Sequence, residues 1–153
     1  MSKLGLNTTL KELLNTTNLI FAHDRDKLSK MAKKILVVED DSYIRKLYEE
    51  VLKDAGFEVE MADDGVSGLD KIKKGGYDLI LLDVVMPKMD GLGVLERLEK
   101  DPPLQKNGPI ILLSNLAKDP IIQGGLGKGA SGYIVKSDIN PDQLIENVKK
   151  HLK

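Results

Sequence analysis

Apolar and polar residues form two alternating kinds of segment from residue 35 onward. Short runs of branched apolar residues predict strands at Ile35–Glu39, Phe57–Ala62, Leu79–Asp83, Ile110–Ser114 and Gly132–Lys136. Between them, apolar residues recur at helical spacing and predict helices near Ser42–Ala55, Asp64–Lys74, Leu92–Lys100, Pro120–Lys128 and Pro141–Leu152. Five strand–helix units of this kind predict an α/β fold, with a doubly wound, mostly parallel sheet between two layers of helices.

Residues that start and stop helices support these boundaries. Asp54–Gly56 predicts a helix end with a glycine cap. Asp119 followed by Pro120 predicts a helix start, because an N-cap side chain and a first-turn proline suit that position, and Asn140 with Pro141 repeats the pattern.

The first 30 residues differ, because they show no strand pattern. Their apolar residues predict one amphipathic helix, roughly Thr9–Ala22, with a capping box at Thr9 and Glu12 and a polar link through Asp24–Lys30. The helical spacing is carried by Leu10, Leu13, Leu14, Thr17 and Phe21. We therefore expect an N-terminal extension at residues 1–31 and a main domain at 32–153. Two interpretations of the extension stay open: a helix that docks on the domain, or a loosely attached segment from an upstream start codon.

Acidic residues stand at the ends of two predicted strands. Glu39 and Asp40 follow the first strand, and Asp83 ends the third. If these strands lie side by side and parallel, the three carboxylates converge at one edge of the sheet. Like charges so close repel each other, so the cluster needs a cation or raised pKa values. Oxygen ligands favour a hard divalent ion such as Mg²⁺, and this predicts a metal-assisted site for phosphoryl chemistry.

Composition excludes several other classes of function. The net charge is −1 and aromatic residues make up 4% of the 153 residues, with no Trp, so the sequence does not indicate nucleic-acid binding. The chain has no Cys, which removes disulfides and thiolate ligands. No apolar run reaches membrane-spanning length and no signal peptide is evident, so we expect no membrane partner and a cytoplasmic location.

Five short motifs occur in a fixed order, each at the end of a predicted strand. They are Glu39-Asp40, Asp83, Met86-Pro87-x-x-Asp90-Gly91, Ser114 and Lys136. Together they resemble the receiver domain of bacterial two-component response regulators over about residues 32–152, as a stand-alone receiver similar to chemotaxis regulators. The resemblance implies a flavodoxin-like fold, a five-stranded parallel sheet in the order 2-1-3-4-5 with five surrounding helices. The N-terminal helix would be an addition to that fold.

The same resemblance assigns roles to individual residues. Asp83 corresponds to the family's phosphorylated aspartate. Asp40 would bind Mg²⁺ directly, as would Asp83 and the backbone carbonyl of Val85, while Glu39 would act more remotely, through water. Asp41 is instead interpreted as the boundary residue of the first helix of the domain.

The remaining roles concern the phosphoryl oxygens and the switch. Lys136 would pair with Asp83 and later with the phosphoryl group, and Ser114 would donate its hydroxyl to that group. Tyr133 would occupy the family's rotameric switch position. Two residues depart from the family pattern: Ser137 stands where a proline usually follows the lysine, and the bulkier Asn115 follows Ser114.

The function implied is signalling rather than enzymatic turnover of a substrate. The receiver would take a phosphoryl group from a sensor histidine kinase or a histidine phosphotransfer protein, and would catalyse only its own phosphorylation and dephosphorylation. With no effector domain after Lys153, it would pass the signal to a separate, unidentified partner. Two alternatives remain, a degenerate receiver that only binds proteins and an aspartyl-phosphate hydrolase. The hydrolase is disfavoured because Val85 stands where such enzymes carry a second aspartate.

Overall fold

The computed structural model describes the backbone of residues 2–116, 118 and 120–152, and the side chains of 9–24, 32–116, 118 and 120–152. The chain divides into two compact units, Met1–Ala32 and Lys33–Lys153. Among the described residues, no helix combines the length and apolar character that crossing a membrane requires.

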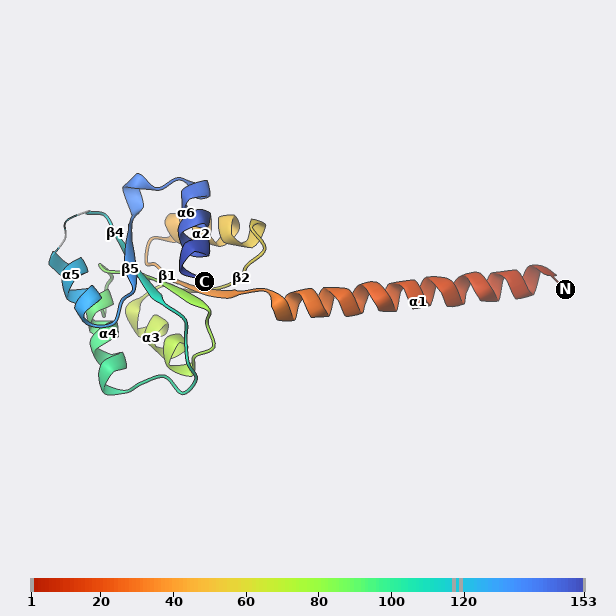
Figure 1. The fold of residues 1–153 in the computed structure, drawn as a ribbon, viewed down its shortest axis with the longest axis horizontal. Helices are drawn as coiled ribbons and strands as arrows, with labels where there is room; N and C mark the ends of the chain where they lie inside the picture. The colour runs from red at the N-terminus through yellow and green to blue at the C-terminus, as the bar shows by residue number, and fades with distance from the viewer. Residues whose placement is uncertain (1, 117, 119, 153) are drawn as a thin grey trace. The chain divides into compact units, whose positions relative to one another are not determined.

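The second unit is built on one parallel sheet, as the sequence predicts. Its strands are β1 (Lys34–Val38), β2 (Glu58–Ala62), β3 (Leu79–Asp83), β4 (Ile110–Ser114) and β5 (Gly132–Val135). They lie in the order β2-β1-β3-β4-β5, with every neighbouring pair parallel (Figure 1). The fold is therefore the flavodoxin-like arrangement that the resemblance implies. The predicted strand bounds are correct to within one residue.

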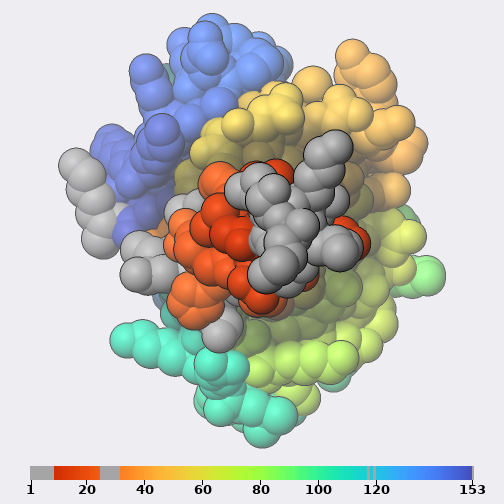
Figure 2. Space-filling model, turned by 90° about the vertical axis from the view of Figure 1, so that its right-hand side faces the viewer, coloured from red at the N-terminus to blue at the C-terminus, as the bar shows by residue number. Residues whose placement is uncertain are grey.

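Helices cover both faces of the sheet (Figure 1). They are α2 (Ser42–Asp54), α3 (Gly65–Lys74), α4 (Gly91–Lys100), α5 (Pro120–Gly127) and α6 (Pro141–His151), with a short 3-10 turn, η1, at Lys136–Asp138. Residues of α2 and α6 pack on one face, and residues of α3, α4 and α5 pack on the other. In space filling, the blue α6 lies beside the yellow end of α2 (Figure 2).

The alternation of side chains along the strands produces the two halves of the core. In β1, Ile35 and Val37 pack with Leu52 of α2, whereas Leu36 and Val38 pack on the opposite face. All four of these β1 side chains are fully buried. Because helices cover both faces of the sheet, its central strands are nearly continuous runs of apolar residues. Each run ends at the edge of the sheet, where the first polar side chain follows.

Most predicted helix ends agree with the structure. Asp41 caps α2 by accepting hydrogen bonds from the backbone N–H groups of Tyr43 and Ile44, and Gly56 follows with a φ of 94°. Asn140 and Gln143 form a reciprocal capping box at the start of α6. The cap predicted at Asp119 lies outside the described residues.

The N-terminal unit differs from its prediction in two respects. It is one helix, α1 (Ser2–Met31), so Thr9 lies within the helix instead of at a capped start, and the polar link predicted after Asp24 is helical. The segment carries no Pro and no Gly after residue 5, so nothing in it terminates a helix. The apolar side chains of Leu10, Leu13 and Phe21 are exposed.

Candidate functional site

The acidic residues lie where the central strands end. Glu39 directly follows β1, and its backbone N–H still donates to the carbonyl of Ala62, 3.1 Å away, so it continues the register with β2. Asp83 is the last residue of β3, the strand next to β1. Parallel strands bring these carboxyl ends together, which is where ligands bind in open α/β sheets.

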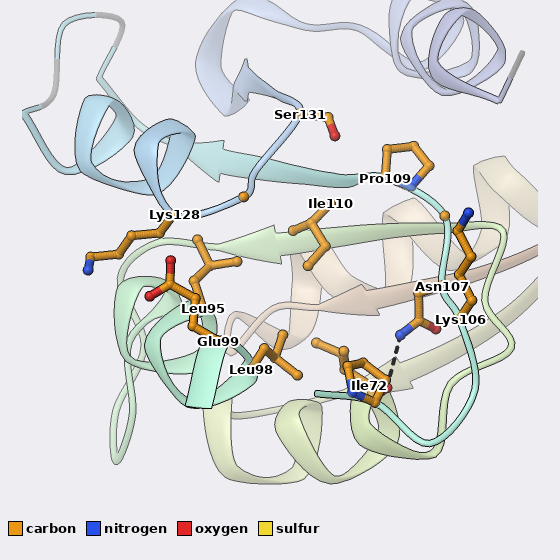
Figure 3. A pocket seen from close by; sticks show the side chains of 13 residues that line it. Ile72, Leu95, Leu98, Glu99, Lys106, Asn107, Pro109, Ile110, Lys128 and Ser131 are labelled. Carbon is orange, nitrogen blue, oxygen red and sulfur yellow. Dashed lines mark hydrogen bonds between the residues drawn. The ribbon is translucent and has the colours of Figure 1, made fainter. Parts of the chain in front are cut away.

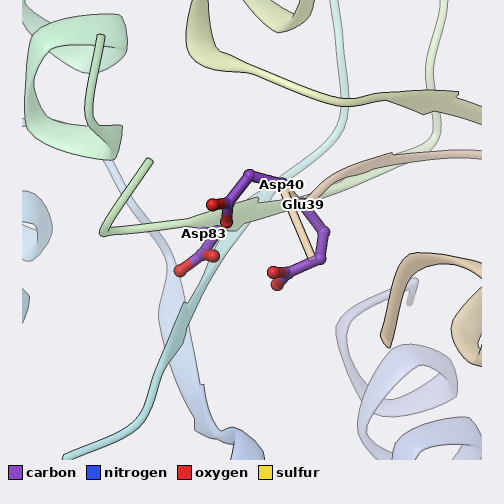
Figure 4. Close-up of side chains that lie close together, drawn as sticks. All are labelled: Glu39, Asp40 and Asp83. Atoms are coloured by element: carbon purple, nitrogen blue, oxygen red, sulfur yellow. The ribbon is translucent and has the colours of Figure 1, made fainter. Parts of the chain in front are cut away.

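Three carboxylates meet at this edge (Figure 4). Glu39, Asp40 and Asp83 each offer an oxygen atom, and these atoms lie within 4.8 Å of one another. Glu39 and Asp83 are buried and Asp40 is exposed. A cleft of about 420 Å³ opens beside them, lined by Glu39, Asp40, Asp41, Ile44, Asp83, Val84, Val85, Ser114, Asn115, Leu116 and Lys136. An all-oxygen set of this kind suits a hard divalent cation.

Lys136 joins the two buried carboxylates. Its Nζ lies 3.0 Å from Oε2 of Glu39 and 3.1 Å from Oδ2 of Asp83. Burial alone lowers the pKa of this lysine, but the charges of Asp83 and Glu39 outweigh burial, and its pKa is raised above the ordinary value. Lys136 therefore keeps its positive charge inside the site, as the sequence predicts for a partner of Asp83.

One ammonium group does not balance two buried carboxylates. Burial raises the pKa of Glu39 to about 7, the charge of Asp83 acts in the same direction, and Lys136 opposes both. Burial also raises the pKa of Asp83, against the opposing charge of Lys136. Raised pKa values in both carboxyls mean that the site is favourable for an additional positive charge.

The other predicted site residues are placed as follows. Val85 borders the cleft, and its backbone N–H donates to Oδ1 of Asp83 over 3.2 Å. Ser114 ends β4 and also borders the cleft, but its hydroxyl donates to the carbonyl of Leu116 at 3.2 Å. Tyr133 lies on β5 with 42% of its surface exposed, outside the cleft.

The segment after Asp83 leads into α4 through Asp90 and Gly91. Asp90 caps α4 by accepting from the N–H of Gly93 at 2.7 Å. Gly91 is needed because of a close approach and not because of a left-handed backbone, since its φ is not positive. A Cβ at Gly91 would lie 2.6 Å from the carbonyl oxygen of Asp83, so a side chain would displace the β3 end.

One residue near the site was not predicted from the sequence. Arg45, in the first turn of α2, donates from Nη1 to the carbonyls of Glu39 at 2.8 Å and Asp40 at 3.2 Å. The only signal in the sequence is its position four residues after the cap residue Asp41.

The bond from Lys136 to Ser137 is trans, as are the other described peptide bonds.

A larger pocket, of about 690 Å³ (Figure 3), shares no lining residue with the acidic cleft. It is bordered by Ile110, the first residue of β4, whereas Ser114 at the other end of the same strand borders the acidic cleft. Its lining includes the apolar Leu95 and Leu98 and the basic Lys106. Because it holds no pair of carboxylates, the chemistry described above belongs to the smaller cleft.

Comparison with known proteins places this arrangement in a family. The family model described as the response regulator receiver domain matches residues 35–149. The chain is 35% identical over 123 residues to a chemotaxis protein of Treponema pallidum, a match that covers 78% of this chain and 83% of that protein. Two further relatives are much longer chains, and the matching segment makes up 7% of one and 15% of the other.

Solved structures agree with this match. A CheY-like response regulator receiver domain from Methanospirillum hungatei is 35% identical, with a TM-score of 0.68, covering 79% of this chain and 94% of that one. The receiver domain of a sensor histidine kinase from Pseudomonas aeruginosa, 26% identical with a TM-score of 0.68, covers 79% of this chain and 98% of that one. That structure carries a magnesium ion coordinated in its active-site cleft. The chain thus belongs to the response regulator receiver domains, the phosphoryl-accepting signalling modules of two-component systems.

Proposed function

We propose that Asp83 is the phosphoryl acceptor of this receiver. A carboxylate oxygen of Asp83 attacks the phosphorus of a phosphohistidine, a P–O bond forms, the P–N bond breaks, and the imidazole leaves with the electron pair. The observation that carries the proposal is the Lys136 ammonium, held 3.1 Å from Asp83 inside a cleft that also presents Asp40. A phosphoryl group adds ~1.5 to 2 negative charges, which this cationic side chain is positioned to neutralise.

Mg²⁺ is the cation that this donor set fits. Asp40 and Asp83 would bind it directly with the carbonyl of Val85, and Glu39 would act more remotely. The buried Glu39 supports the remote role, because its carboxylate already accepts from Lys136 and from the N–H of Asp41. When bound, the ion supplies positive charge against the oxygens of the transferred group.

Ser114 and Tyr133 would respond to the phosphoryl group. Ser114 exchanges its local bond to the carbonyl of Leu116 for a bond to a phosphoryl oxygen, and Tyr133 leaves its exposed position and turns inward. The surface that changes is formed by α5, β5 and α6, which corresponds to the output face of the family. A downstream target reads that surface.

The receiver domain comprises residues 32–153 and the extension residues 1–31. The division into compact units at Ala32 supports these bounds. The donor is the phosphohistidine of a sensor kinase or a phosphotransfer protein. The module is not an enzyme with an external product, because it catalyses only its own phosphorylation and dephosphorylation.

Two other functions are less well supported. An aspartyl-phosphate hydrolase needs a second acid two residues after the nucleophile, and Val85 has no titratable group. A degenerate receiver needs no acceptor chemistry, yet acceptor, lysine and acidic pair all border one cleft.

Intact-mass measurement separates the three functions. The full chain is incubated with a small phosphodonor, with Mg²⁺ or with a chelator. A receiver gains one phosphoryl group only with Mg²⁺ and not as Asp83→Asn, which is nearly isosteric. A hydrolase consumes the donor without stable addition, and a degenerate receiver does neither. Full phosphorylation of the Asp83→Asn variant would show that another residue is the acceptor.

A further inference from the structure

Arg45 hydrogen-bonds to the backbone of the segment that carries two of the acidic residues. Its Nη1 lies 2.8 Å from the carbonyl oxygen of Glu39 and 3.2 Å from that of Asp40. Among the described residues, no ion pair joins Arg45 to a carboxylate. Arg45 is half-buried, at the start of α2.

Few other bonds fix this segment. Glu39 is tied to β2 by its N–H, and its carboxylate accepts from the N–H of Asp41 at 3.1 Å. Asp40 has an exposed side chain, and the bond that holds its carbonyl is the one from Arg45. The same guanidinium thus fixes the peptide groups on both sides of the exposed carboxylate.

We propose that Arg45 is a positioning residue for the divalent-cation site. It holds the backbone of Glu39 and Asp40 so that the Asp40 carboxylate stays beside Asp83 before the ion arrives. The inference rests on the proposed function of the cleft, and it adds a residue that touches neither the ion nor the phosphoryl group. Partners that orient metal ligands in this way typically contribute 10–100-fold to metal affinity.

The sign of the effect separates positioning from charge. Arg45 is a cation near a cation site, so by charge alone its removal should strengthen Mg²⁺ binding. If Arg45 acts by positioning, its removal should weaken Mg²⁺ binding, because the Asp40 carboxylate loses its fixed place. The two effects oppose each other, and the measured direction decides between them.

Three variants of the full chain make the test. Arg45→Met removes the donor and the charge at similar length. Arg45→Lys keeps the charge and one donor group on a shorter side chain. Lys46→Met is the matched control, because Lys46 is the neighbouring exposed cation and the substitution removes the same positive charge. Calorimetric titration with MgCl₂ gives the Kd, and the Mg²⁺ dependence of phosphorylation by a small phosphodonor gives the half-saturating concentration and the maximal rate.

Arg45→Met should raise the Kd for Mg²⁺ by roughly 10–100-fold, with the maximal rate at saturating Mg²⁺ close to wild type. Arg45→Lys should fall between, and Lys46→Met should bind as wild type or slightly tighter. An Arg45→Met protein that is folded by circular dichroism and binds Mg²⁺ as tightly as wild type would overturn the proposal. If Arg45→Met does not fold, unchanged affinity in Arg45→Lys overturns it equally.

Failure of the proposed function gives a different result. In that case wild type takes up no phosphoryl group at any Mg²⁺ concentration, while the calorimetric Kd still depends on Arg45. If wild type is phosphorylated and the Kd is independent of Arg45, the acceptor assignment stands and the positioning role of Arg45 is wrong.

Discussion

At the scale of single residues, the buried Glu39 carboxyl makes stability depend on pH. Burial raises its pKa from an ordinary 4.5 to about 7. Below the lower value, the carboxyl is protonated in both the folded and the unfolded chain. Between the two values, the unfolded chain ionises this carboxyl while the folded chain keeps it neutral, so the free energy of unfolding falls. Above the upper value, the folded chain is ionised as well and the loss is complete. The stability that the neutral carboxyl contributes is therefore present at low pH and is lost as pH rises through about 7.

A comparison with Glu39→Gln measures this contribution. Without divalent cations, wild type should lose free energy of unfolding relative to the variant as the pH rises from about 5 to about 8. Adding Mg²⁺ at the higher pH should stabilise wild type more than the variant, because the ion compensates the ionised carboxylates. Denaturant titrations give both quantities, and parallel pH curves for the two proteins would show that Glu39 does not titrate differently in the folded chain.

Two exposed apolar residues beside the acceptor predict a long-lived phosphorylated state. Val85 and Leu116 are each 64% exposed and border the cleft. The family resemblance implies that these positions would flank the path of the attacking water, and neither apolar side chain can orient water by hydrogen bonding. Positioned general-base groups typically contribute ~10²–10⁴-fold, so the loss of phosphate should be slow.

The variants Val85→Asn and Leu116→Glu should accelerate that loss. Leu104→Glu is the control, since Leu104 is 91% exposed and does not border the cleft. Phosphate release is followed from the isolated phosphorylated protein. Rapid phosphate release from wild type that neither cleft variant accelerates would contradict the prediction of a long-lived phosphorylated state. It would point to Asn115 as the group that positions water.

At the same scale, some contacts within the site could not be predicted from the sequence. The motif order predicted that Asp83, Asp40 and Lys136 come together, because each lies at or just after a strand end and strand ends converge, and all three border one cleft. It did not reveal that Lys136 bonds to Glu39 as well as to Asp83, nor that Arg45 holds the adjacent carbonyls. Those facts depend on side-chain directions, which adjacent positions in a sequence do not specify.

At the scale of elements, α5 is the helix of the receiver domain that is expected to open most readily. It has eight residues, three of them glycines, and each interior glycine costs ~0.8–1 kcal/mol relative to alanine. Hydrogen exchange should therefore show weaker protection at 121–127 than at 144–150 in the capped helix α6. Equal protection of the two segments would contradict this.

Two neighbouring glycines of α5 provide a matched pair. A Cβ at Gly124 would lie 3.7 Å from Leu92, an ordinary contact, so Gly124→Ala should stabilise the protein by roughly 0.5–1 kcal/mol. A Cβ at Gly125 would lie 2.4 Å from the buried Leu112, so Gly125→Ala should destabilise it by roughly 1–3 kcal/mol. Thermal unfolding measures both, and equal shifts would show that packing against β4 does not distinguish them.

Elements bounded by strong signals were predictable. Asn140 and Pro141 started α6 as expected, and the apolar runs gave the strands. The length of α1 was not predicted, because its polar second half lacks the amphipathic pattern, although it also lacks any helix-breaking residue. Periodicity indicates which face of a helix is apolar; it does not indicate where a polar helix ends.

At the scale of the whole molecule, we expect the N-terminal extension to be dispensable for the chemistry. The large apolar side chains described in α1 are exposed, including Leu14 at 62% and Phe21 at 60%. Deleting residues 1–31 should leave the phosphorylation rate and the unfolding midpoint of the remaining domain unchanged. Loss of the fold on deletion would show that these side chains belong to the core.

The central claim is that Asp83 carries the phosphoryl group, and chemical mapping of the acyl phosphate tests it most directly. The protein is phosphorylated with a small donor and Mg²⁺, and borohydride then reduces the acyl phosphate to an alcohol, which converts the modified aspartate to homoserine. Peptide mass spectrometry locates the change. We predict homoserine at position 83, with Asp40 and Glu39 intact. Homoserine at position 40, or a phosphorylated protein with Asp83 unaltered, would contradict the account.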